Sequence, residues 1–149
     1  MQLVDLSLQL WLLMSDPWVK FGPPLQPQPP VIDVVVTGRM SRIAQAPVNC
    51  SIYFTAVVAE YVDLKVVEGE PIRTKRVAVA HPCAEMARQT FSRSAGTLEA
   101  FRVGDSHRLE LAHENPWPLL DFVFALDDPA SAPDYYAVRV DSVASGDEN

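Results

Sequence analysis

The stretch Val31-Ile32-Asp33-Val34-Val35-Val36-Thr37-Gly38 carries the clearest structural signal in this sequence of 149 residues. All but one of the seven residues before Gly38 are β-branched, and the exception is Asp33. Branched side chains at Cβ lose rotamer freedom in a helix and pack well on a pleated, half-buried surface. The stretch therefore predicts a β-strand that ends near Gly38.

Further segments downstream have the same character and are separated by turn residues. Glycine, proline, asparagine or aspartate stands between most of them, and several short strands at such spacing are typical of a barrel or a sandwich. The predicted strands are Ser51 to Val58, Tyr61 to Val67, Arg76 to Ala80, His107 to Ala112, Phe122 to Leu126 and Tyr135 to Val143.

The order of these segments resembles that of the OB-fold barrel over residues 31–111. Three strands come first, a stretch with helix-forming residues at Ala84 to Phe91 follows, and Phe101-Arg102-Val103-Gly104-Asp105 then introduces a further strand. The resemblance implies a ligand site across the second and third strands, built from stacking aromatic and basic residues. We accordingly expect a mainly β fold: a single small antiparallel β-barrel (OB-like) or a β-sandwich, with one short helix and an extended N-terminal arm.

Length and composition favour one domain with two arms. A hydrophobic content of 48% suffices for a core. Residues 1–30 form an apolar arm followed by a proline-rich spacer, residues 31–143 the β domain, and residues 144–149 an acidic tail. The net charge of −7 disfavours nucleic acid and anionic membranes as partners, because the long-range field repels both.

The apolar arm has no basic residue before its hydrophobic run and no small-x-small cleavage site, so it makes a poor secretory signal. It is also too short to span a bilayer. We therefore expect a cytoplasmic protein. The leucines of the arm fit both a strand period and a helical stripe. On either reading its large side chains need a surface to cover, which is most simply the sheet of the same domain and otherwise a partner protein. Its expected contact residues are Leu6, Leu10, Trp11 and Trp18.

A second candidate contact residue is Trp117, which stands between Pro116 and Pro118. The two prolines exclude a helix interior or a central strand, so a rigid loop must carry the tryptophan. It either packs on the end of the β domain or serves as an anchor for a partner, since tryptophan is enriched in interface hot spots.

Two cysteines and three histidines are the other residues with distinctive chemistry. Without a secretory signal, Cys50 is expected to be a free thiol, and so is Cys83; a pair released only by a reductant would contradict the cytoplasmic location. The candidate metal ligands are His81, Cys83, His107 and His113. Their spacing matches no established zinc pattern, so no metal and no cofactor are predicted.

No catalytic signature is complete: the serines lack a Gly-x-Ser-x-Gly elbow and no glycine-rich phosphate loop precedes a helix. The sequence therefore favours a non-enzymatic interaction module, an adaptor or structural subunit that binds a protein partner or itself. A small-ligand or single-stranded nucleic-acid-binding barrel is the alternative, and a metal-dependent enzyme using the histidine and cysteine residues is a third possibility. The ligand-binding residues of the alternative would be Tyr53, Tyr61, Arg73, Lys75 and Arg76.

Overall fold

The valine run forms the first half of strand β1, Val34–Ile43, in a computed structural model that describes residues 28–126 and 132–144. Val34 and Val36 are buried in the core, as the strand pattern predicts. The other elements are β2 (Thr55–Gly69), β3 (Val77–Pro82), the helix α2 (Arg88–Phe91), β4 (Ser106–Ala112), β5 (Phe122–Phe124) and β6 (Tyr135–Ser142).

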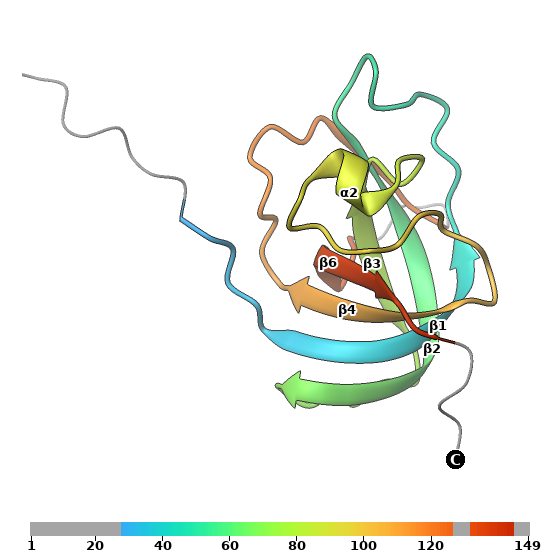
Figure 1. The fold of residues 1–149 in the computed structure, drawn as a ribbon, viewed down its shortest axis with the longest axis vertical. Coiled ribbons are helices and arrows are strands. Elements are labelled where there is room, and N and C mark those ends of the chain that lie inside the picture. Colours follow the sequence, from blue (N-terminus) through green and yellow to red (C-terminus); the bar gives the residue numbers. More distant parts are fainter. Residues whose placement is uncertain (1–27, 127–131, 145–149) are drawn as a thin grey trace, which may run out of the picture.

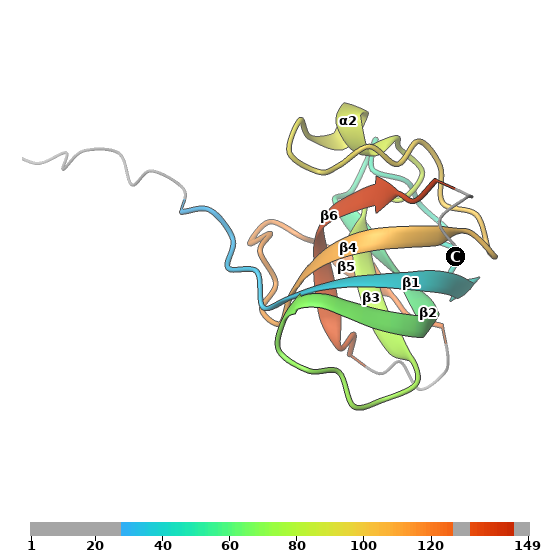
Figure 2. The ribbon, with the colours of Figure 1, turned by 60° about the horizontal axis from the view of Figure 1, so that its bottom comes forward.

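Five of the strands close into a barrel, so the prediction of a small mainly β barrel is confirmed. The strand order is β1-β4-β6-β3-β2, and β2 pairs back with β1 to complete the ring. The pairing is mixed rather than purely antiparallel, because β3 and β6 run parallel. The short β5 adds to β2 as an extra parallel strand outside the ring. Figures 1 and 2 show the closed ring of strands with α2 across one of its ends.

The interior of the barrel is mainly apolar and also holds a polar cluster, which is described below. Leu109, Leu111 and Val79 are fully buried, and burying a side chain of this size stabilises the fold by roughly 1.5–3 kcal/mol. The loop after α2 packs tightly on β6 through Gly96, where a Cβ atom would lie 2.0 Å from the carbonyl oxygen of Val140. Glycine therefore lets this loop approach the strand backbone, and the loop closes one end of the barrel.

The two predicted strands Ser51 to Val58 and Tyr61 to Val67 are wrong as separate elements, because β2 is one strand of 15 residues. The acid at its middle, Glu60, lies on the outer face, where Ser41 and Arg42 donate hydrogen bonds to its carboxylate at 2.8 and 2.9 Å. An acid with these partners does not interrupt a strand.

The predicted helix at Ala84 to Phe91 is confirmed only over Arg88–Phe91. Its first part is held in a turn by Cys83, whose φ is +46° and whose carbonyl accepts a hydrogen bond from the Met86 amide at 3.0 Å. Ala87 then has a ψ of 141°, which is not helical, so α2 begins only at Arg88.

Residues 28–32 are exposed and lead away from the barrel, as Figure 1 shows. Val31 is 75% exposed, and burial in the barrel begins with Val34. Deleting residues 1–30 should therefore leave a domain that unfolds cooperatively with nearly unchanged stability. Denaturant unfolding of the full and shortened chains checks this expectation. Aggregated or molten shortened protein would show instead that the arm belongs to the core.

Candidate functional site

The polar cluster in the barrel joins three side chains from three strands. The Tyr61 hydroxyl lies 3.1 Å from His81 Nε2 and 2.9 Å from His107 Nδ1, and all three residues have 0% exposure. The hydroxyl has a single hydrogen, so it donates to one imidazole and accepts from the other. Burial, and then the nearby Arg88 guanidinium, hold the pKa of His81 well below its ordinary value, and burial also lowers the pKa of His107. Both histidines are thus neutral in the folded protein.

Arg88 lies next to this cluster, at the end of the barrel that α2 covers. Its guanidinium donates to the carbonyl oxygens of Pro82 (2.8 Å) and Cys83 (2.6 Å). It also lies 5.1 Å from the ring centroid of Phe91 and 5.0 Å from that of Phe101. Burial lowers the pKa of Arg88 to about 10, so the group remains charged at neutral pH. The cluster is therefore shielded from solvent, and among the described residues His81 Nδ1, His107 Nε2 and Arg88 Nε are buried without a hydrogen-bond partner.

The candidate metal ligands named from the sequence do not meet at one point. His81 and His107 bind Tyr61, whereas His113 stacks on Tyr135 at 4.7 Å and pairs with Glu70. Among the described residues, the group close enough to hold a metal ion is a different one, formed by Cys50, Cys83 and Glu85.

The prediction of free thiols is wrong, because Cys50 and Cys83 form a disulfide. The antiparallel pairing of β2 with β3 brings them together: Ala56 lies opposite Pro82, and the Cys83 amide donates to the Thr55 carbonyl at 2.8 Å. Cys83 therefore leaves the sheet beside the loop that carries Cys50. Disulfides persist mainly in oxidising compartments, so this bond weighs against the cytoplasmic location, which stays a prediction.

An exposed apolar surface lies on the two loops that flank the starts of β2 and β5. We call it the loop surface; its members are Ile52 (73% exposed), Tyr53 (44%), Leu119 (80%) and Phe122 (48%). The Tyr53 and Phe122 rings meet edge to face at 5.5 Å. Of these four residues, the sequence suggested only Tyr53. Ile52 and Phe122 fell within predicted strands, where alternation alone does not tell which side chains stay exposed.

The loop surface rests on a rigid base. The Phe54 amide donates to the Asp121 carboxylate at 2.8 Å, and the Asp121 amide donates to the Phe54 carbonyl at the same distance. Thr55 and Phe122 are the first paired residues of β2 and β5. The disulfide holds the first loop to the end of β3. These bonds hold the ends of the two loops side by side at Tyr53 and Phe122.

The residues suggested for ligand or nucleic-acid binding are not brought together. Tyr61 is buried in the core, which excludes it as a stacking platform. Tyr53 comes just before β2, whose first residues pair with the Pro82 end of β3. The basic residues come just before Val77, at the opposite end of β3, where Val77 pairs with Tyr61. The length of β3, about 17 Å, separates the two ends. The basic residues at the far end are Arg73, Lys75 and Arg76, and Arg76 lies 3.6 Å from Glu60.

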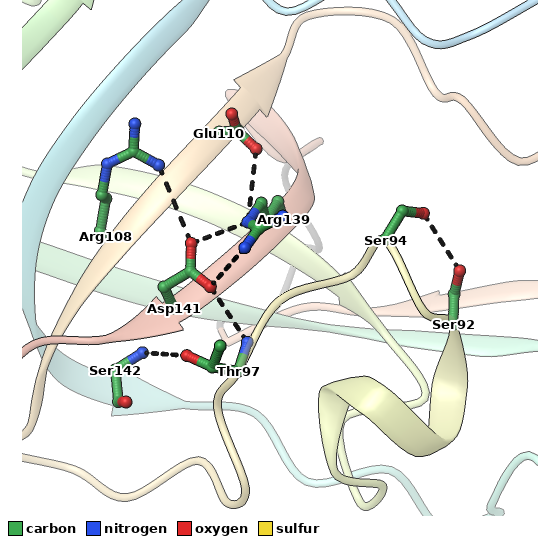
Figure 3. Close-up of polar contacts among 8 residues, drawn as sticks. All are labelled: Ser92, Ser94, Thr97, Arg108, Glu110, Arg139, Asp141 and Ser142. Carbon is green, nitrogen blue, oxygen red and sulfur yellow. Dashed lines mark hydrogen bonds and ion pairs between the residues drawn. The ribbon is translucent and has the colours of Figure 1, made fainter.

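The outer face of β4 and β6 carries further charged residues that neutralise each other, as Figure 3 shows. Asp141 accepts hydrogen bonds from Arg139 at 2.8 Å and from the Thr97 amide at 3.0 Å, and it lies 3.8 Å from Arg108. Arg139 also lies 3.9 Å from Glu110. With carboxylates beside both arginines, this face offers little positive charge to a phosphate backbone.

Trp117 packs partly on the barrel. It is half-buried, and its ring meets that of Tyr136 edge to face at 6.2 Å. Its role as an anchor stays a prediction. The proposed contact residues of the arm, Leu6, Leu10, Trp11 and Trp18, lie outside the described residues.

Comparisons with known proteins provide no relative for this chain: no protein-family model, no curated protein and no solved structure matches it. Within residues 28–126 and 132–144, no helix is long and apolar enough to cross a membrane.

Proposed function

We propose that this chain is a non-enzymatic protein-interaction module that binds its partner through the loop surface. The observation that carries the proposal is the exposure of four large apolar residues on a base fixed by hydrogen bonds and a disulfide. The Tyr53 and Phe122 rings contact each other, and large exposed apolar patches mark interaction sites. A rigid platform also loses little conformational entropy on binding.

The distribution of charge and of titratable groups supports this proposal. Tyr61, His81 and His107, whose chemistry would suit catalysis, are fully buried behind Arg88 and cannot contact a substrate. An enzyme needs such groups at an accessible site. We therefore favour an adaptor or a subunit of an assembly, whose partner is a protein or a second copy of the chain.

We further propose that the barrel is of the OB type. Three features support this assignment: the first three strands pair antiparallel in succession, a helix lies between the third and fourth strands, and a parallel pair of strands closes the barrel. In OB barrels the loops between the first and second strands and between the last two strands of the ring contact the ligand. The corresponding loops here include residues 44–54 and 113–121, which carry Ile52, Tyr53 and Leu119 of the loop surface; Phe122 follows directly. The proposed binding position is thus the usual one for this fold.

A ligand- or nucleic-acid-binding barrel remains the alternative function, since the same loops would serve it. Single-strand binding combines stacking aromatics with a positive groove, and its affinity falls steeply with salt. Glu85 and Asp121 carry negative charge next to the loop surface, and the basic residues lie at the other end of β3. A protein partner therefore fits this surface better.

A double variant, Tyr53→Ser with Phe122→Ser, should keep the fold and lose the partner. Both rings are about half exposed, so the free energy of unfolding should change by less than about 1 kcal/mol. Affinity capture from the native cell, quantified by mass spectrometry, measures the partner recovered by the wild type and by each variant.

The matched control is Val67→Ser with Val103→Ser, two residues that are 55% and 59% exposed away from the loop surface. We expect the control to recover the same stoichiometric partner as the wild type and the loop-surface variant to recover less than about a tenth of it, the loss of a hot spot of roughly 1.4 kcal/mol or more. Equal recovery by all three proteins would rule out the loop surface as the binding site.

A further inference from the structure

Three ligand atoms that suit a thiophilic metal ion lie together at the disulfide. The Sγ atoms of Cys50 and Cys83 and a carboxylate oxygen of Glu85 are all within 4.8 Å of one another. Tetrahedral zinc has bonds of about 2.3 Å to sulfur and about 2.0 Å to oxygen, which place its ligand atoms between 3 and 4 Å apart. Separating the two sulfur atoms of the reduced pair would therefore bring the three ligands to the spacing that a single ion requires.

Hydrogen bonds position the three ligands in addition to the disulfide. Glu85 Oε1 accepts a hydrogen bond from the Cys50 amide at 2.6 Å, so the carboxylate stays beside the first cysteine. Arg88 Nη2 donates to the Cys83 carbonyl at 2.6 Å, and the Cys83 amide donates to Thr55, which fixes the second cysteine. Cys50 lies half-buried on the loop, and its Sγ atom is 3.5 Å from the Thr55 carbonyl oxygen.

The charges at this position also suit a divalent ion. Two thiolates and one carboxylate give three negative charges, and a divalent cation leaves one of them uncompensated. The Arg88 guanidinium, held against the Cys83 carbonyl, supplies the remaining positive charge. A nearby cation also favours the thiolate form, which is the form that binds metal.

We propose that the reduced form of Cys50 and Cys83, together with Glu85, is a binding site for one zinc-like divalent metal ion, with a water molecule in the fourth position. A cellular dithiol supplies the two electrons and two protons that convert the disulfide into two thiols, and itself becomes a disulfide. Metal binding then releases the two thiol protons. Paired cysteines in a reducing compartment commonly serve as metal ligands. This inference concerns the reduced protein, whereas the proposed function is argued for the oxidised protein, whose disulfide helps to hold the loop surface.

The test is a cobalt titration of the full chain after reduction by a phosphine, which does not compete for the metal as a thiol would. We expect a 1:1 complex with thiolate-to-cobalt charge-transfer bands, displaced by zinc, and no such bands for the oxidised protein. Glu85→Gln keeps both cysteines and should raise the Kd for cobalt at least about tenfold, since even the loss of an outer-shell partner commonly costs that much. The matched control is Glu99→Gln, which changes an exposed carboxylate and should bind cobalt as the wild type does.

Three outcomes would overturn the proposal: no charge-transfer bands in the reduced protein, equal binding by the oxidised protein, or an unchanged Kd in Glu85→Gln. The variant Cys50→Ser should abolish the bands. Because this variant also removes the disulfide, circular dichroism must first show that it is folded, and Glu85→Gln decides the question if it is not.

Discussion

Lowering the pH from 7 to 5 should destabilise the protein by up to about 1.4 kcal/mol per pH unit for each of its two buried histidines. The pKa of His81 and the pKa of His107 are lower in the folded protein than in the unfolded chain, mainly because of burial. The unfolded state therefore binds protons more readily. The stability that the neutral histidines contribute is complete above the ordinary histidine pKa of about 6.5 and is lost as the pH falls toward the folded pKa values.

The charged groups around the pair are Arg88, which opposes protonation of His81, and Asp105, which favours protonation of His107. Denaturant unfolding at pH 7.5, 6.5 and 5.5 measures the slope. The carboxylates with lowered pKa values, Glu60 and Asp141, begin to lose their contribution near pH 5, below the range of these measurements. The variant His107→Asn should show about half the slope. A free energy of unfolding that stays constant between pH 7.5 and 5.5 would contradict the burial of neutral histidines.

Removing the disulfide should cost about 3–4 kcal/mol of stability. The two cysteines are 33 positions apart, and closing a loop of this length restricts the unfolded chain by about that amount. The double variant Cys50→Ala with Cys83→Ala should lower the free energy of unfolding accordingly. Denaturant titrations of both proteins, with and without a reductant, check the effect.

The double variant provides the control for the reductant, because a protein without cysteines should not respond to it. Alkylation of the denatured wild type before and after reduction gives an independent readout. Two cysteines that react without reduction would contradict the disulfide and restore the prediction of free thiols.

The sequence predicted the barrel because its strands are encoded locally. Val34 to Val36 specify β1 by their branching, and the alternation of Leu109 and Leu111 specifies β4. The fusion of two predicted strands into β2 was not predictable from the local pattern, since the partners of Glu60 come from β1, 18 and 19 positions away. Strand bounds depend on such distant contacts.

The candidate site was largely missed for the same reason. The exposure of Phe122 depends on the parallel pairing of β5 with β2, and the disulfide depends on the register between β2 and β3. Tyr61 was predicted to be a stacking residue, but its hydroxyl lies between two buried histidines. Residue type alone did not distinguish these positions, because the relevant partners lie far along the chain.

The most direct test of the proposed interaction is to measure the Kd of the partner at low and at high salt. The wild type is compared with the double variant Tyr53→Ser, Phe122→Ser. If the loop surface is the binding site, the double variant should raise the Kd by about 30-fold or more, the equivalent of roughly 2 kcal/mol, and salt should have little effect on the wild type. An unchanged Kd in the double variant, or a steep loss of wild-type affinity with salt, would contradict an apolar protein-binding surface.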